Sequence, residues 1–285
     1  MDRAVLDLYD EFRHTPMPRR EFLDRLTKLA GGATAATALL PMLEGDAEAA
    51  KVAPGDPRLE AAEVTYPGPA GAVKAYQARP KGAGPLPAVL VIHENRGLND
   101  HIRDVARKAA VGGFHALAPD LLSRKGGTPP VQEQAIAAIR DLARTDALAD
   151  ARAGVASLQK SAQVAGGKVG TVGFCWGGAM VNLLAANEPA LKAGVAFYGF
   201  PPDLKLVAGV RAPLFLIYAG NDTRVNAGVP AYLDALKKAG KTFVTETYPG
   251  VEHAFHNDTA GTRYNQKAAD DAWAKTVAFF KKHLG

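Results

Sequence analysis

The chain contains one cysteine, Cys175, among its 285 residues. A single cysteine cannot form an intramolecular disulfide, and it excludes a zinc site made of several thiolates. A phosphate-binding loop is also absent, because no Lys-Ser or Lys-Thr pair follows Gly173 to Gly178, and Gly166-Gly167-Lys168 precedes a strand-like segment. No period of about 20–50 residues recurs, which excludes a solenoid.

The composition is otherwise that of a soluble globular protein, with 47% hydrophobic and 22% charged residues. The net charge of +5 comes with no nucleic-acid-binding motif, so we assign the basic excess to a solvated surface or to attraction for anionic substrates. The charge is uneven along the chain. Residues 1–49 hold six Lys and Arg against nine Asp and Glu, which leaves a net charge of +8 for the remainder.

The first 49 residues resemble a twin-arginine export signal of bacteria. Arg19 and Arg20 are followed by Phe-Leu, by an apolar run over residues 29–43, and by a small-x-small pattern that predicts cleavage after Ala49. The run is too short and too rich in Gly and Thr for a membrane anchor, so we expect no stable membrane insertion after export to the periplasm. The alternative is an ordinary amphipathic N-terminal helix.

From residue 59 onward, strand-like and helix-like segments alternate, which predicts βαβ crossovers and a mostly parallel sheet with helices on both faces. No Pro- or Ser-rich linker follows Pro57, so residues 50–285 are read as one α/β domain. The expected strands cover residues 64–66, 73–78, 87–92, 114–118, 168–174, 193–197, 213–218 and 242–248. Helices are expected over residues 100–111, 177–186, 229–238 and 270–283, and helical segments are expected within residues 132–158.

Cys175 lies in a Gly-x-Cys-x-Gly pattern between an expected strand and an expected helix. This is the nucleophile-elbow pattern with Cys in place of Ser. The helix N-terminus would direct its free N–H groups at the thiolate, and the backbone N–H of Trp176 would serve as one oxyanion donor. The alternative is that Cys175 is a small buried hydrophobic residue.

An acid and a histidine follow in the order that this type of fold requires. Asp222 comes just after the strand over residues 213–218, and His253 comes on the loop after the strand over residues 242–248. Both therefore lie at the carboxyl edge of the sheet, where α/β proteins place their sites. Asp222 could instead be a turn residue, and His256 could be the active histidine.

These motifs together resemble the dienelactone hydrolase family of α/β-hydrolases, which includes carboxymethylenebutenolidase. The resemblance covers residues 59–284, and it is carried by His93-Glu94-Asn95-Arg96-Gly97, Ala118-Pro119-Asp120-Leu121, Gly173-Phe174-Cys175-Trp176-Gly177-Gly178, Gly220-Asn221-Asp222 and His253-Ala254-Phe255. It implies an α/β-hydrolase fold and a cofactor-free, metal-free hydrolase of lactones or related esters. Catalysis would use a Cys175-His253-Asp222 triad and a thioester acyl-enzyme.

The resemblance also implies a role for Glu94, which would face the thiol and take part in forming the thiolate when substrate binds. A surface-loop glutamate is the alternative. The backbone N–H of Asn95 would be the second oxyanion donor, beside that of Trp176.

One position departs from the family pattern. Where family members that act on dienelactone carry an arginine four residues after the histidine, this chain has Asn257. Arg263, or failing that Arg96, could bind a substrate carboxylate instead, and Arg140 and Arg144 are candidates for a second arginine. Tyr198 and His256 are further candidate substrate-binding residues, although Tyr198 could equally be a core aromatic residue.

Other functions on the same fold remain open at this point. One is a general carboxylesterase or thioesterase with a simple apolar acyl pocket. Another is a non-catalytic binding protein in which Cys175 senses oxidation or ligands. We expect a monomer or weak dimer that binds a small-molecule ester or lactone and no nucleic acid.

Overall fold

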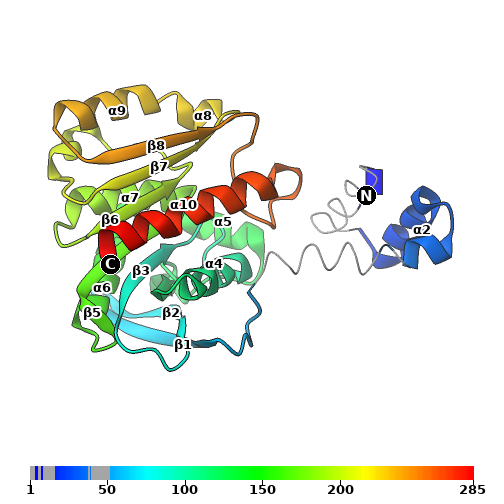
Figure 1. Cartoon of the computed structure of the whole chain (residues 1–285), viewed down its shortest axis with the longest axis horizontal. Coiled ribbons are helices and arrows are strands. Elements are labelled where there is room, and N and C mark those ends of the chain that lie inside the picture. The colour runs from blue at the N-terminus through cyan, green and yellow to red at the C-terminus, as the bar shows by residue number, and fades with distance from the viewer. Residues whose placement is uncertain (1–3, 6–7, 9–16, 38, 40–51) are drawn as a thin grey trace.

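The computed structural model describes residues 4–5, 8, 17–37, 39 and 52–285. Eight strands form one sheet in the spatial order β1-β2-β4-β3-β5-β6-β7-β8 (Figure 1). β1 pairs with β2, and β2 with β4, in antiparallel fashion, and the other five pairs are parallel. The strands are β1 (Leu59–Gly68), β2 (Gly71–Pro80), β3 (Leu86–Ile92), β4 (His115–Pro119), β5 (Val164–Phe174), β6 (Ala193–Phe197), β7 (Leu214–Ala219) and β8 (Phe243–Tyr248).

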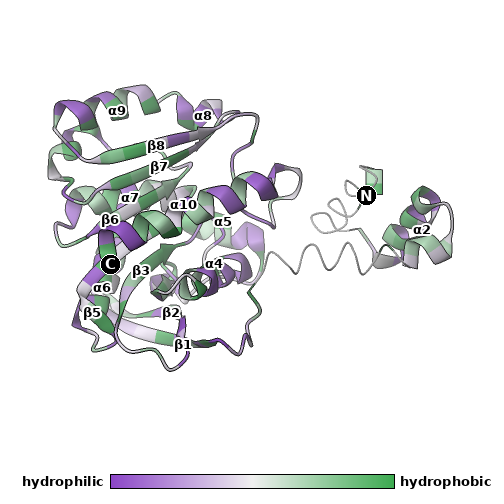
Figure 2. Ribbon diagram, viewed as in Figure 1, coloured by the Kyte–Doolittle hydropathy of each residue, from purple (hydrophilic) through white to green (hydrophobic). Residues whose placement is uncertain are grey.

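Helices cover both faces of the sheet, so the predicted mostly parallel α/β architecture is confirmed. One face carries α4 (Asp100–Val111) and α10 (Gln266–Leu284). The other carries α5 (Gln132–Arg140), α6 (Arg144–Lys160), α7 (Trp176–Asn187) and α9 (Val229–Lys238). In Figure 2, α10 shows both hydrophilic and hydrophobic stretches, as expected for a helix between the sheet and solvent.

The apolar run of β3 lies in the middle of the sheet and is buried on both sides. Ala88, Leu90 and Ile92 belong to the core beneath α6 and α7, whereas Val89 and Val91 belong to the core beneath α4 and α10. This division follows from the alternation of side chains along a strand. A strand that feeds both cores reads as continuous hydrophobic sequence rather than as an alternating pattern.

The structure differs from the expected elements mainly at their ends. β1 is much longer than residues 64–66, because it pairs with β2 along its whole length. The paired residues include Pro67. That proline is tolerated because β1 is an edge strand. The helical segments expected within residues 132–158 are α5 and α6, and α6 extends two residues beyond that range. The four-residue helix α8 (Thr223–Asn226) and three 3₁₀ helices, Ser123–Lys125, Leu204–Gly209 and Gly261–Arg263, were not predicted.

In the N-terminal region, helix α2 (Arg19–Ala30) begins at the paired arginines. Phe22 and Leu26 are buried in a small cluster with Val5, Leu8 and Ala36. The expected cleavage position, after Ala49, lies outside the described residues. Within the part of the chain that the structure describes, no helix has the length and hydrophobicity to cross a bilayer.

Candidate active site

Four chemically active side chains follow the carboxyl ends of four parallel strands. Glu94 follows β3, Cys175 follows β5 directly, Asp222 follows β7, and His253 lies on the loop after β8. Because these ends share one edge of the sheet, the four residues reach a common site although they are far apart in the sequence.

The turn that carries Cys175 is strained and tightly packed. Cys175 has φ 55° and ψ −114°, a conformation that costs a non-glycine residue about 1–3 kcal/mol. Its backbone N–H donates to the Phe197 carbonyl oxygen over 3.0 Å. A Cβ on Gly177 would lie 2.4 Å from the carbonyl oxygens of Ile92 and His93, so only glycine lets α7 approach the end of β3 this closely. These contacts hold the Cys175 side chain above the edge of the sheet.

Cys175, His253 and Asp222 form a continuous hydrogen-bonded chain. His253 Nε2 lies 3.0 Å from Cys175 Sγ, and His253 Nδ1 is hydrogen-bonded to Asp222 Oδ2. An ionised carboxylate only accepts hydrogen bonds, so Nδ1–H is the donor to Asp222 and Nε2 is free to accept from the thiol. Asp222 Oδ1 accepts from the Val225 N–H at the start of α8, which fixes the carboxylate. The arrangement can remove a proton from sulfur and return it to a leaving group.

The thiol is held in its neutral form by its surroundings. Burial first, and the Glu94 carboxylate second, raise the pKa of Cys175 from 9.0 to about 12. The Trp176 backbone N–H, which donates to the sulfur, and the more distant Arg224 cation lower the pKa and only partly oppose this shift. Cys175 is therefore a thiol in the unliganded site at neutral pH, and ionisation needs a proton acceptor close by.

Glu94 is buried, with only 4% of its surface exposed, and is held by neutral donors. Asn257 Nδ2 donates to Glu94 Oε2, and the Tyr198 hydroxyl lies 3.5 Å from Glu94 Oε1. The Asn257 amide is itself oriented, because its Oδ1 accepts from both the N–H and the hydroxyl of Thr259, at 2.9 and 2.7 Å. Asn257 stands where the family pattern has an arginine, and in this structure its amide positions Glu94. Sequence reasoning missed this contact, which joins two loops.

The segment between Glu94 and β3 is also fixed. His93 Nε2 accepts from the Leu121 N–H over 3.2 Å, so its Nδ1 donates to the Glu94 carbonyl oxygen over 2.7 Å. The His93 ring stacks on Trp176 at 5.4 Å, which links the loop after β3 to the turn after β5. These two segments carry the backbone N–H groups of Asn95 and Trp176 that the sequence suggested as oxyanion donors.

A cavity of about 170 Å³ lies over the thiol. Six residues that the sequence predicted line it: Cys175, His253, Glu94, Asn95, Arg96 and Arg263. Asn257, Ile136, Ala254 and Arg224 line it as well. Arg224 was missed by the sequence analysis, although its position two residues after Asp222 places it at the same strand end. Its guanidinium lies over the Phe200 ring at 5.1 Å.

Two candidate substrate-binding residues do not line this cavity. His256 is buried among aromatic rings, stacked on Phe174 at 4.8 Å, and burial places its pKa well below the ordinary value. It therefore packs in the core as a neutral ring and is too enclosed to contact substrate. Tyr198 is also fully buried, with its ring 5.0 Å from that of His253 and its hydroxyl near Glu94.

Neither candidate for a second arginine reaches the cavity over the thiol. Arg140 is exposed on α5, and Arg144 lines a separate hollow beside α7. Across the described residues, no group of three or more His, Cys, Asp or Glu side chains is arranged to hold a metal ion.

Comparison with known proteins assigns the chain to a family. The dienelactone hydrolase family matches residues 73–284. The chain belongs to this family. It is accordingly a carboxylic-ester hydrolase with the α/β-hydrolase fold.

Individual relatives match over most of their length. A Methylorubrum extorquens protein, provisionally named carboxymethylenebutenolidase, is 34% identical, over 79% of this chain and 82% of its own. The Aquifex pyrophilus protein usf is 36% identical, over 74% of this chain and 94% of its own. The solved structure of a provisionally named dienelactone hydrolase from Klebsiella pneumoniae is 30% identical with a TM-score of 0.72, and the match covers 79% of this chain and 99% of that one.

Proposed function

We propose that this dienelactone hydrolase family member cleaves a lactone or related carboxylic ester with Cys175 as the nucleophile. The observation that carries the proposal is the hydrogen-bonded chain from Asp222 through His253 to Cys175, with 3.0 Å between His253 Nε2 and the sulfur. A strained turn and a cavity over the sulfur accompany it, as a nucleophile elbow requires.

The reaction begins when the thiol proton passes to His253 Nε2, and the Glu94 carboxylate takes part as a second proton acceptor beside the sulfur when substrate binds. The sulfur attacks the carbonyl carbon, and the carbonyl electron pair moves to the oxygen, which the Asn95 and Trp176 N–H groups stabilise. Collapse breaks the ester C–O bond, and the leaving oxygen takes the proton from His253. The product of this half-reaction is a thioester on Cys175.

Water then completes the cycle. His253 removes a proton from a water molecule, whose oxygen attacks the thioester carbonyl. Collapse of the second tetrahedral intermediate breaks the C–S bond, releases the carboxylic acid and returns the proton to sulfur. Asp222 stabilises the imidazolium in both halves, because its carboxylate accepts from Nδ1–H.

A panel of lactones and aryl esters, with and without a carboxylate group, tests this mechanism. We expect Cys175→Ala to lower turnover by about three orders of magnitude or more. Acid quenching of the wild-type enzyme during turnover should leave the acyl group on the peptide that contains Cys175, as mass spectrometry would detect. Undiminished turnover by Cys175→Ala would exclude the mechanism.

The same panel separates the remaining functions. Preference for simple neutral esters over anionic lactones would indicate a general carboxylesterase or thioesterase. A folded protein that hydrolyses none of the panel while Cys175 is alkylated rapidly would instead indicate a thiol-based sensor.

We also propose that residues 1–49 direct export to the periplasm through a twin-arginine-type signal. The paired arginines at the start of α2 and the apolar run after them support this. Replacing both Arg19 and Arg20 with Lys should move the protein from the periplasmic to the cytoplasmic fraction of a bacterial host, with Lys28→Arg as the charge-neutral control. Mature periplasmic protein whose N-terminal sequence still includes Arg19 and Arg20 would contradict cleavage after Ala49.

A further inference from the structure

The motif over residues 118–121 carries part of the family resemblance but has no role in the reaction proposed above. Asp120, within it, directly follows β4 and is buried. Its carboxylate closes the loop over residues 120–128, because Oδ1 accepts from the Leu122 N–H over 3.0 Å and Oδ2 accepts from the Thr128 N–H over 2.7 Å. A buried carboxylate is costly unless hydrogen bonds compensate for its lost hydration, so these contacts bind the loop closely to Asp120.

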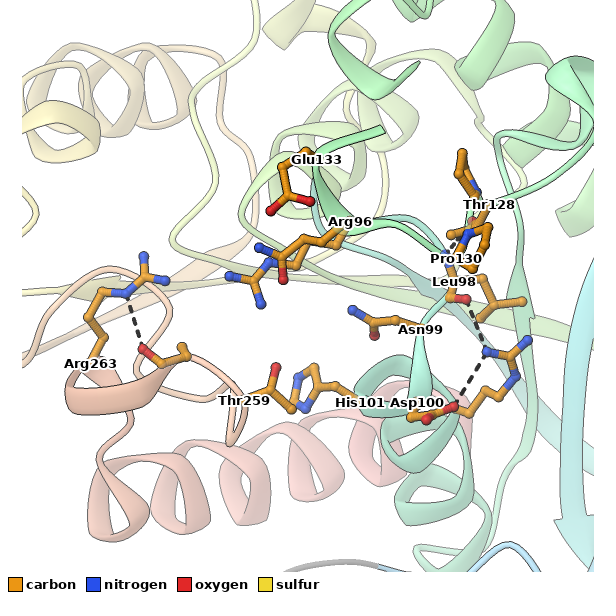
Figure 3. Close-up of a pocket in the computed structure, with 14 residues that line it drawn as sticks. Arg96, Leu98, Asn99, Asp100, His101, Thr128, Pro130, Glu133, Thr259 and Arg263 are labelled. Carbon is orange, nitrogen blue, oxygen red and sulfur yellow. Dashed lines mark hydrogen bonds and ion pairs between the residues drawn. The ribbon is translucent and has the colours of Figure 1, made fainter. Parts of the chain in front are cut away.

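The Thr128 side chain connects this loop to the segment that follows β3. Its hydroxyl donates to Asp120 Oδ1 over 2.8 Å, because an ionised carboxylate can only accept. The hydroxyl oxygen is then free to accept from the Leu98 N–H over 2.9 Å. Thr128 and Leu98 lie side by side in the wall of a hollow of about 1030 Å³ that adjoins the cavity over the thiol (Figure 3). Asp120 therefore fixes the direction of the hydroxyl, and the hydroxyl fixes the backbone at Leu98.

Gly97 allows the Thr128 side chain to lie against a backbone turn. The turn spans residues 94–97, and the Gly97 N–H closes it by donating to the Glu94 carbonyl oxygen over 3.4 Å. Gly97 has φ 71°, in the left-handed region that favours glycine, and a Cβ at this position would lie 2.2 Å from Thr128 Oγ1. The Thr128 hydroxyl is thus packed directly against the end of the turn that carries Asn95.

The same segment after β4 also holds the start of this turn. The Leu121 N–H donates to His93 Nε2, and His93 Nδ1 donates to the Glu94 carbonyl oxygen. The turn is therefore fixed on both sides of Asn95, which lines the cavity over Cys175. Among the described residues, none accepts a hydrogen bond from the Asn95 N–H. A backbone N–H that is unpaired and held in one direction is what an oxyanion requires.

We propose that Asp120 and Thr128 are positioning residues for the hydrolysis: through the Leu98 backbone, they hold the Asn95 N–H in the direction of the developing oxyanion. Such donors stabilise a transition state because they need no reorientation while the charge develops. A shift of about 1 Å at a reacting group can lower the rate by about a hundredfold. The proposal rests on the proposed hydrolysis at Cys175, and it gives the residues after β4 a function in that reaction.

Substitutions of Thr128 and Asp120 test this role with nitrophenyl acetate as the substrate. Thr128→Val removes the hydroxyl at similar volume, so kcat should fall roughly ten- to hundredfold with KM nearly unchanged. Thr128→Ser keeps the hydroxyl and should retain most of the turnover. Asp120→Asn should act like Thr128→Val, because an amide NH₂ group replaces one of two oxygens that each accept hydrogen bonds. Wild-type kcat in both Thr128→Val and Asp120→Asn, or equal losses in Thr128→Ser and Thr128→Val, would overturn the proposal.

Two further measurements separate positioning from general damage to the site. Iodoacetamide alkylates the sulfur by displacing iodide from carbon and forms no oxyanion, so its rate with Cys175 should stay at the wild-type value in each variant. With benzyl trifluoromethyl ketone, the sulfur adds to the carbonyl carbon, the carbonyl electron pair moves to oxygen and the thiol proton passes to His253. The inhibition constant of this ketone should rise by the factor by which kcat/KM falls. Alkylation that slows as much as ester turnover would overturn the proposal.

Thr276→Val is the matched control. It removes a buried hydroxyl that donates to the Ala272 carbonyl oxygen over 2.8 Å within α10, a helix that contributes no residue to the cavity over the thiol. It should leave kcat, the alkylation rate and the inhibition constant unchanged. If neither Thr128→Val nor Asp120→Asn folds, a crystal structure of the wild-type adduct with the ketone decides. The proposal requires that the adduct oxygen accepts from the Asn95 N–H while Thr128 still accepts from Leu98, and the absence of either contact would overturn it.

Failure of the positioning role can be told apart from failure of the proposed function. If Cys175→Ala loses hydrolysis of nitrophenyl acetate while Thr128→Val and Asp120→Asn retain it, only the positioning role is wrong. If Cys175→Ala hydrolyses nitrophenyl acetate as the wild type does, or if neither protein hydrolyses any ester, both proposals are wrong.

Discussion

Cys175 combines a reactive position with an unreactive resting state. The strained backbone and His253 suit the sulfur to its proposed role as nucleophile, yet burial and Glu94 raise its pKa to about 12. Thiolates react with oxidants much faster than thiols do, so this neutral state protects a cysteine that has no disulfide partner in its own chain. The same contacts that keep the sulfur protonated would therefore preserve the proposed nucleophile in the oxidising compartment to which we propose that the protein is exported.

Replacing Glu94 with Gln should have opposite effects on the free thiol and on catalysis. Removal of the carboxylate charge lowers the pKa of Cys175 toward its ordinary value, while burial still holds it above 9.0. Alkylation by iodoacetamide, followed against pH, should then shift to lower pH. Ester turnover should fall by roughly tenfold or more, because proton-transfer groups contribute about 10²–10⁴-fold.

A distant glutamate provides the matched control for this test. Glu246→Gln removes a carboxylate that pairs with Lys275 on the surface, and it should change neither measurement. An alkylation profile in Glu94→Gln that coincides with that of the wild type would show that the Glu94 charge does not act on the thiol.

At the scale of elements, the turn from β5 into α7 determines how closely α7 can approach the end of β3. Gly177 allows α7 to contact the backbone at the end of β3, and the next residues of that strand lead to Glu94 and Asn95. Helix α7 therefore positions two components of the site at once. It carries the residue after the proposed nucleophile, and it supports the loop that bears Asn95, the second of the proposed oxyanion donors.

Gly177→Ala should consequently damage both stability and activity. The added methyl group meets two carbonyl oxygens at 2.4 Å, and neither can move without shifting β3 or α7. We expect a loss of about 1–3 kcal/mol in the free energy of unfolding, measured with urea, together with a fall in kcat. Gly84→Ala serves as the control, since its methyl group would meet nothing within 4 Å. Wild-type stability in Gly177→Ala would show that this approach is not tight.

The elements predicted best from the sequence are those with a pattern contained within one strand or the turn that follows it. The apolar run of β3 and the Gly-x-Cys-x-Gly pattern after β5 predicted the central strands, because strands buried on both faces and nucleophile elbows have local signatures. The length of β1 was underestimated because most of its residues are exposed and show no apolar alternation, so its order depends on pairing with β2. Contacts between loops, such as Asn257 with Glu94, have no local signature, and neither does the burial of His256.

At the scale of the whole molecule, several histidines are buried in the neutral form. Burial lowers the pKa of His93 and His256, and burial together with Arg79 lowers that of His115 from 6.5 to about 4. The unfolded chain binds protons at these positions below about pH 6.5, whereas the folded chain binds them only at lower pH. Protonation therefore favours unfolding, and stability falls as the pH decreases.

The window for His115 lies between its unfolded and folded pKa values, about pH 6.5 to 4. A histidine that is neutral in the folded chain and protonated in the unfolded chain makes the free energy of unfolding depend on pH. Its contribution to the slope is at most about 1.4 kcal/mol per pH unit. His115→Leu should therefore flatten this slope in urea titrations across the window, whatever it does to stability at pH 7, and His115→Gln should act in the same way. His283→Gln, at the surface end of α10, should change the slope less. If the free energy of unfolding has the same slope against pH in both His115 variants as in the wild type, the prediction is wrong. The His115 ring would then take up its proton at the same pH in the folded and unfolded chains.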